Sequence, residues 1–142
     1  MTTKAYLEQI ERFELMMQNK SSEIERLKSK LTSVTVASKE VNVQVSFDKD
    51  RMGDTVAKMA DLTKELNILV DYYINKRKRI IQQVDSIKDT NMYHVLSGRY
   101  ISRKKMGEIA IEMKCSVRQV YRIHKNALAE FERIFGKEYK ST

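Results

Sequence analysis

The chain has 142 residues with a net charge of +8, no proline and a single cysteine. Proline most often interrupts a helix, so its absence predicts an all-α fold, and a lone cysteine excludes an internal disulfide and is typical of a cytoplasmic protein. No apolar run approaches the roughly 20 residues of a membrane span, and no signal-type apolar segment follows the first four residues, so we expect no membrane partner.

Residues 6–34 carry a heptad repeat of apolar side chains, with Glu, Lys and Arg at most other positions. The first row of the repeat consists of Ile10, Met17, Ile24 and Leu31. The second row consists of Phe13, Leu27 and Val34, with Lys20 as its one polar member. Such spacing over about four heptads is typical of a narrow coiled-coil seam.

A second heptad repeat covers residues 56–87. Its first row consists of Met59, Leu66, Tyr73, Ile80 and Ile87. Its second row consists of Val56, Thr63, Val70, Arg77 and Val84. The basic run at residues 76–79 on this helix leaves two interpretations open, a solvated helix face or a second contact to phosphate or RNA polymerase.

Residues 35–53 interrupt the heptads and predict a polar loop between the two helices. Val41, Val43, Val45 and Phe47 alternate with polar residues, as in a short strand or an extended segment. Gly53 would end the loop and Asp54 would cap the second helix. We therefore expect residues 1–89 to form a long antiparallel coiled-coil hairpin, and its thin seam favours pairing as a homodimer.

The basic excess lies in the last third of the chain. Residues 91–142 carry eleven Lys or Arg against five Asp or Glu, whereas residues 1–53 and 54–90 each carry a net charge of +1. Apolar spacing predicts short helices over 91–101 and 105–113, then a longer helix from Ser116 to Phe135 that Gly136 would stop. Residues 90–142 would thus be a separate domain with a helix-turn-helix motif.

The start of the last helix has the chemistry of a DNA-reading element. Ser116 and Gln119 form a capping-box pair, and the apolar residues that follow would face inward. The side chains left on the opposite face would contact base edges in the major groove: Val117, Arg118, Tyr121 and Arg122. The residues expected at the DNA backbone are Arg103, Lys104, Lys105, Ser116, Gln119 and Lys125.

These residues also carry a resemblance to known proteins. The segments Arg99-Tyr100-Ile101, Gly107–Met113, Ser116–Val120 and Ala127-Leu128 resemble region 4 of sigma factors, where a helix-turn-helix reads promoter DNA. The run from Ser116 to His124 is similar to the ArpU/RinA-type late transcription regulators of phages and prophages. The resemblance is specific over residues 99–128 and architectural before them.

The resemblance implies a phage or mobile-element transcription regulator that acts in the cytoplasm of a bacterial host. Its partners would be double-stranded DNA and a second copy, with host RNA polymerase as a further candidate, and activation of late genes is the expected outcome. Two alternatives stay open: a DNA-packaging adaptor of the small terminase type, and a helical interaction protein that docks on RNA polymerase.

Catalytic and metal sites are not expected. The chain has no glycine-rich phosphate loop, metalloprotease motif or nucleophile elbow, so we expect no enzyme activity and no cofactor. His94, His124 and Cys115 match no zinc-binding spacing. We expect Cys115 to pack in the turn and His124 to have a structural role.

Overall fold

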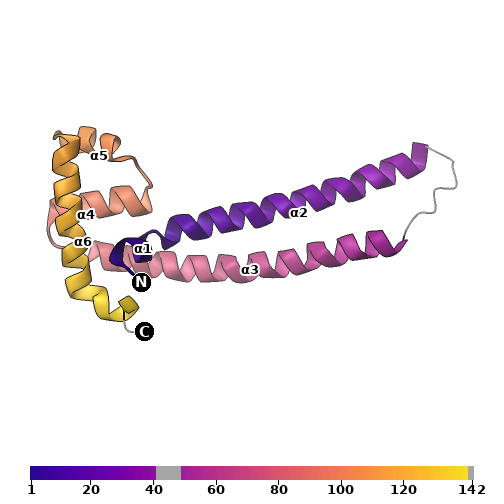
Figure 1. Cartoon of the computed structure of the whole chain (residues 1–142), viewed down its shortest axis with the longest axis horizontal. Coiled ribbons are helices and arrows are strands. Elements are labelled where there is room, and N and C mark those ends of the chain that lie inside the picture. The colour runs from indigo at the N-terminus through magenta and orange to yellow at the C-terminus, as the bar shows by residue number, and fades with distance from the viewer. Residues whose placement is uncertain (41–48, 141–142) are drawn as a thin grey trace. The chain divides into compact units, whose positions relative to one another are not determined.

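The computed structural model describes residues 1–40 and 49–140, with side chains described outside residues 34–50. All of its elements are helices, which confirms the all-α fold class (Figure 1). In chain order they are α1 (Thr3–Leu7), α2 (Gln9–Glu40), α3 (Lys49–Asp85), α4 (Thr90–Leu96), the π-helix η1 (Ser97–Ile101), α5 (Met106–Met113) and α6 (Val117–Lys140). The predicted extended segment from Val41 to Phe47 lies outside the described residues.

The chain divides into two compact units. Unit 1 contains Met1–Phe13 and Tyr73–Thr142, and unit 2 contains Glu14–Tyr72. This division differs from the predicted boundary between residues 89 and 90. The reason is that Ile80 and Val84 at the end of α3, and Ile87 just after it, are buried in the same hydrophobic cluster as Ala127 and Phe131 of α6.

Unit 2 consists of the antiparallel parts of α2 and α3 (Figure 1). Leu27 and Leu69 are the two buried side chains among its described residues, and each is 9% exposed. Lys20, the polar member of the first heptad, is half-buried, and its Nζ lies 2.9 Å from Oε2 of Glu65. The lysine therefore fits the seam because a carboxylate on the facing helix takes its charge.

The second predicted heptad row on α3 is wrong at Val56 and Thr63, whereas Val84 at its other end is buried. Met59 and Leu66 are half-buried, as the first row requires. Val56 and Thr63 of the second row are exposed, and Leu62 and Leu69 take the inner positions instead. The two registers differ by a single residue and satisfy the heptad spacing equally well, so spacing alone does not distinguish them.

The predicted loop over residues 35–53 is also too long. Helix α2 continues to Glu40 and α3 begins at Lys49, so Gly53 and Asp54 lie inside a helix. Gly53 has no positive φ, and a Cβ at this position would have no neighbour within 4 Å. A helix-interior glycine costs about 1 kcal/mol relative to alanine, which a helix of 37 residues tolerates.

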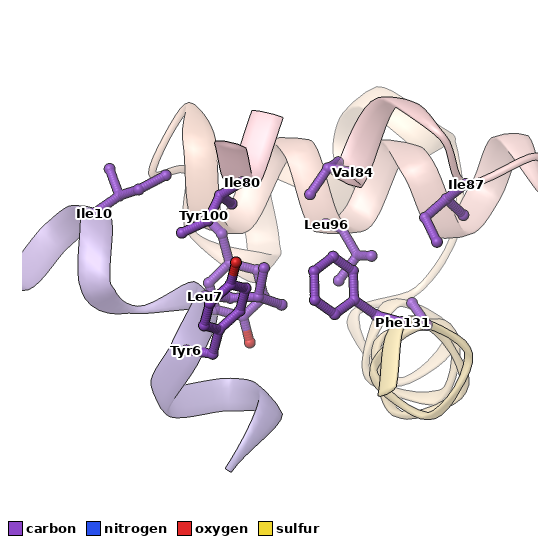
Figure 2. Packing of buried hydrophobic residues seen from close by; sticks show 10 residues of the cluster. Tyr6, Leu7, Ile10, Ile80, Val84, Ile87, Leu96, Tyr100 and Phe131 are labelled. Carbon is purple, nitrogen blue, oxygen red and sulfur yellow. The ribbon is translucent and has the colours of Figure 1, made fainter. Parts of the chain in front are cut away.

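The core of unit 1 brings both ends of the chain together. Figure 2 shows Phe131 projecting from α6 toward Leu96 and the side chains of α1. The buried members of this cluster are Tyr6, Leu7, Ile10, Ile80, Val84, Ile87, Leu96, Tyr100, Ala127 and Phe131. A second, smaller cluster contains Val95, Ile109, Ala110 and Val120, and it joins α4 and α5 to the start of α6.

A polar network lies at the edge of the first cluster. The Tyr6 hydroxyl donates to Oε1 of the buried Gln83 at 2.6 Å, and Nε2 of Gln83 donates to Glu138 at 2.5 Å. Arg79 donates to both carboxylate oxygens of Glu138, and this bond is the main cause that lowers the Glu138 pKa. The network satisfies a buried amide that would otherwise destabilise the core.

Helix α6 extends beyond its predicted end at Phe135. Gly136 is buried within the helix, which continues to Lys140. Tyr139 stacks on Tyr6 with 4.3 Å between ring centroids, and its hydroxyl lies 2.8 Å from Thr3 Oγ1. The prediction was wrong because these contacts with the N-terminal residues stabilise the last turn despite its glycine.

Phe131→Ala tests the importance of this core. Phe131 has no exposed area, so its removal should lower the free energy of unfolding by about 3–5 kcal/mol through lost burial and a cavity. The matched control is Ile134→Ala on the same helix, which is 43% exposed and should cost about 1 kcal/mol or less. Urea denaturation measures both, and equal losses would contradict the assignment of Phe131 to the core.

Candidate nucleic-acid interface

A short turn connects α5 to α6. Lys114 ends α5 in the left-handed conformation with φ 56°, and the amide of Cys115 donates to the Ala110 carbonyl at 3.1 Å. The Ser116 hydroxyl then accepts from the Gln119 amide at 3.1 Å, which is the first of the two predicted capping-box bonds. The Ser116 side chain and the turn at Lys114 and Cys115 together determine where α6 begins.

The first turns of α6 have two different faces. Val120 and Ala127 have no exposed area, and Ile123 is partly buried against the second cluster. The four predicted base-contact residues lie on the exposed side: Val117, Arg118, Tyr121 and Arg122. Val117 is 44% and Tyr121 56% exposed, so both side chains are accessible to a partner. Their contact with DNA stays a prediction.

Most acidic side chains after residue 90 pair with cations outside the start of α6, so the cations there have no carboxylate partner within the described residues. Four of the five acidic side chains after residue 90 pair with a cation elsewhere: Glu112 with Lys104, Glu130 with Arg133, Glu132 with Lys140, and Glu138 with Arg79. Arg118, Arg122 and Lys125 are exposed and have no carboxylate partner in the part of the chain that the structure describes. The first turns of α6 therefore present three exposed cations to an anionic partner.

The basic turn at residues 102–105 is held in place by the π-helix before it. The amide of Ser102 donates to the Ser97 carbonyl at 2.9 Å, and the amide of Lys104 donates to the Gly98 carbonyl at 2.8 Å. Arg103 between them has a positive φ of 57°, a conformation that non-glycine residues rarely adopt. A π-helical turn and a left-handed residue in succession are features that often occur at functional sites.

Two of the predicted backbone contacts in this turn already have carboxylate partners. Arg103 Nη2 lies 3.5 Å from Glu11 Oε1, and Lys104 Nζ donates to Glu112 at 2.5 Å. The Lys104 bond, followed by the one with His94, lowers the Glu112 pKa. Lys105 is exposed with no such partner among residues 1–40 and 49–140. Sequence reasoning missed both glutamates, because their partners lie on other elements.

The basic run at residues 76–79 is partly structural. Arg79 belongs to the Glu138 network, and Lys76 Nζ lies 5.7 Å from the centroid of the Tyr6 ring. Both cations border a hollow of about 390 Å³ beside Gln9 and Tyr139. These contacts hold the N-terminal and C-terminal helices on α3, so this run has a packing role whatever else it contacts.

His124 has the structural role that the sequence predicts. Its Nε2 lies 2.6 Å from the Tyr100 hydroxyl, and the two rings stack with 5.7 Å between centroids. Burial, followed by the Lys4 and Arg99 charges, lowers the His124 pKa. Burial also raises the pKa of Tyr100 to about 12, with a further contribution from Glu8. The pair therefore remains neutral near pH 7 and packs within unit 1.

The residues considered for zinc binding are engaged in other contacts. Cys115 packs beside the second cluster, and His94 is paired with Glu112. No group of three or more His, Cys, Asp or Glu suited to a metal ion occurs within the described ranges 1–40 and 49–140. In the same ranges, no helix combines the length and apolar character needed to cross a membrane.

A family model described as "Protein of unknown function (DUF1492)" matches residues 30–132, which is more than half of the chain. The chain belongs to the DUF1492 family. The DUF1492 match covers α3, the 102–105 turn, α5 and the exposed face of α6, and it ends one residue after Phe131. No curated protein and no solved structure matches the chain.

The His124–Tyr100 pair predicts a pH dependence of stability. The folded-state pKa of His124 lies below the ordinary value of 6.5, so between these two values the unfolded chain binds more protons than the folded chain. The free energy of unfolding should therefore fall as the pH is lowered from about 8 through 6.5 toward the folded pKa. His124→Gln should lose less stability over the same range, as measured by urea denaturation at several pH values. Equal losses in both proteins would contradict a buried neutral histidine.

Proposed function

We propose that this protein is a sequence-specific DNA-binding transcription regulator of a phage or mobile element, and that α6 reads the major groove. The observation that carries the proposal is the exposed face of α6, where Arg118, Arg122 and Lys125 have no carboxylate partner in the described chain. A surface of cations with interleaved apolar and aromatic side chains fits a polyanion that also presents base edges.

Each residue of this face has a chemical role in the proposal. Arg118 and Arg122 can present two parallel N–H donors to O6 and N7 of guanine, which is a common specific contact in the major groove. Val117 can contact a thymine methyl group, and Tyr121 can pack on a base or donate to a phosphate. The two arginines lie four residues apart, so one face of the helix carries both.

The DNA backbone contacts would come from the flanking segments. Lys125 and Lys105 are exposed and can bind phosphate directly, while Ser116 and Gln119 lie at the start of α6, where the positive end of the helix favours an anion. Arg103 and Lys104 would first have to leave Glu11 and Glu112. At Arg103 and Lys104, binding to DNA would therefore replace a carboxylate partner with a phosphate.

The resemblance of residues 99–128 to sigma factor region 4 and to ArpU/RinA-type regulators supports the same proposal. It extends the proposal to a helix-turn-helix formed by α5 and α6, to activation of late genes, and to a role beside host RNA polymerase in the bacterial cytoplasm. Pairing of two copies would let two α6 helices bind repeated or palindromic half-sites.

Selection from a random duplex library should yield a defined sequence, and Arg118→Ala and Arg122→Ala should each weaken binding to it by about 1–3 kcal/mol. Each variant should also relax the preference at one base pair, because a bidentate base contact is lost. The matched control is Arg133→Ala, which lies on α6 but pairs with Glu130 and should leave the affinity unchanged. Electrophoretic mobility shift at several salt concentrations measures all four proteins.

Two outcomes would contradict the proposal. Equal affinity for random and selected DNA at about 150 mM salt would exclude sequence-specific regulation. Absence of any shift at low salt would exclude DNA binding altogether and favour a protein-docking role.

Glu112→Gln should increase DNA affinity by about two- to fivefold. The variant frees Lys104 for phosphate and removes a carboxylate that repels the DNA backbone. The dependence of affinity on salt should become steeper, which fluorescence anisotropy can measure. Glu132→Gln is the control, because Glu132 pairs with Lys140 at the far end of α6. An unchanged affinity in Glu112→Gln would show that Lys104 does not contact DNA.

A further inference from the structure

The heptad row that the hairpin does not use forms a continuous outer stripe on α3 within unit 2. The outer stripe consists of Val56, Ala60, Thr63, Asn67 and Val70, spaced alternately by four and three residues. Val56 is 51% exposed, the next three are exposed, and Val70 is half-buried. No member is charged, although 32% of the residues of the chain are charged.

We propose that a second copy of the chain covers the outer stripe, and that the two copies pair through parallel α3 helices. The inference rests on the pairing of two copies in the proposed function and is independent of DNA binding. It assigns the residues of the interface, its orientation and a role for Asn67.

The heptad spacing supports this occupant. Alternating steps of four and three keep a row of residues on one side of a helix, and uncharged side chains in that row are what a coiled-coil partner requires. The Thr63 hydroxyl donates to the Met59 carbonyl at 2.7 Å, so its hydrogen-bonding capacity is used within the helix and the methyl group is available for packing. A stripe without Lys or Arg carries no cation that could neutralise DNA phosphates.

The thin interior of unit 2 supports it as well. Leu27 and Leu69 are its two buried side chains among the described residues, which is little burial for an isolated pair of helices. The outer stripe lies roughly 70° around the α3 axis from the inner row of Met59 and Leu66. A second copy placed there would enlarge the existing core instead of creating a separate contact.

Asn67 favours the parallel orientation. It is exposed near the middle of α3, and its amide makes no side-chain hydrogen bond within the described chain. In a parallel two-fold pair Asn67 lies opposite the same residue of the second copy, and the two amides can hydrogen-bond to each other. In an antiparallel pair centred on Thr63, Asn67 would lie opposite Ala60, and its amide would be buried without a partner. Among antiparallel pairs, only one centred on Asn67 itself would bring the two amides together.

Size-exclusion chromatography with light scattering on the full chain tests the interface. The natural protein should have twice the chain mass of 16.7 kDa. The double variant Val56→Asp with Thr63→Asp should have half the mass of the natural protein, because two carboxylates would oppose those of the second copy. Ile68→Asp is the matched control, since Ile68 is 70% exposed on α3 but lies off the stripe, and its mass should not change. Circular dichroism should show unchanged helix content in both.

Disulfide cross-linking tests the orientation. In a Cys115→Ser background, Asn67→Cys should form a covalent dimer under mild oxidation, whereas Ile68→Cys should not. A natural protein of 16.7 kDa would overturn the pairing, and a mass of eight or more chains would overturn the two-fold stripe in favour of a ring. A dimeric double variant would overturn the assignment to this face, and no cross-link at residue 67 in a dimeric protein would overturn the parallel orientation. None of these measurements involves DNA, so they separate this inference from the proposed DNA binding.

Discussion

The packing of α6 against α4, α1 and the end of α3 is the constraint on which the rest of unit 1 depends. Phe131 is completely buried, and its ring lies 6.0 Å from that of Tyr6 and 5.0 Å from that of Phe135. Because Ile80 and Val84 lie in the same cluster, one aromatic side chain connects the start, the middle and the end of the chain. The buried Gln83 also restricts the geometry of this packing, because its side-chain amide accepts a hydrogen bond from Tyr6 and donates one to Glu138.

The same packing determines which side of α6 faces solvent. Because Val120, Ala127 and Phe131 are buried, Arg118 and Arg122 lie on the exposed side of the helix. Four of the five acidic residues after residue 90 are paired with other cations, and two cations of the 102–105 turn are paired with carboxylates. Some cations are thus paired with carboxylates within the fold, whereas others are available to a partner. The proposed DNA contact depends on the second group.

Local patterns predicted much of this from the sequence. The spacing of apolar residues was sufficient for the all-α class and for the inward face of α6, and Ser116 with Gln119 located its first turn. Helix ends were less predictable, because Gly53 and Gly136 resemble stop signals. Helix α3 continues through the exposed Gly53, and contacts of Tyr139 with the N-terminal residues stabilise α6 beyond Gly136. The register of α3 was missed because adjacent rows both satisfy a heptad. The pairing of Glu11 and Glu112 with the basic turn depends on tertiary contacts that have no local sequence signal.

The most direct test of the central claim is to map which residues of the protein contact DNA. Nuclear magnetic resonance spectra of the ¹⁵N-labelled chain, recorded during titration with a short DNA duplex at low salt, report the amides that lie at the interface. The largest shifts are expected at residues 116–125, with smaller shifts at residues 102–105. Shifts confined to α2 and α3, or no shifts at all, would contradict a DNA-reading role for α6.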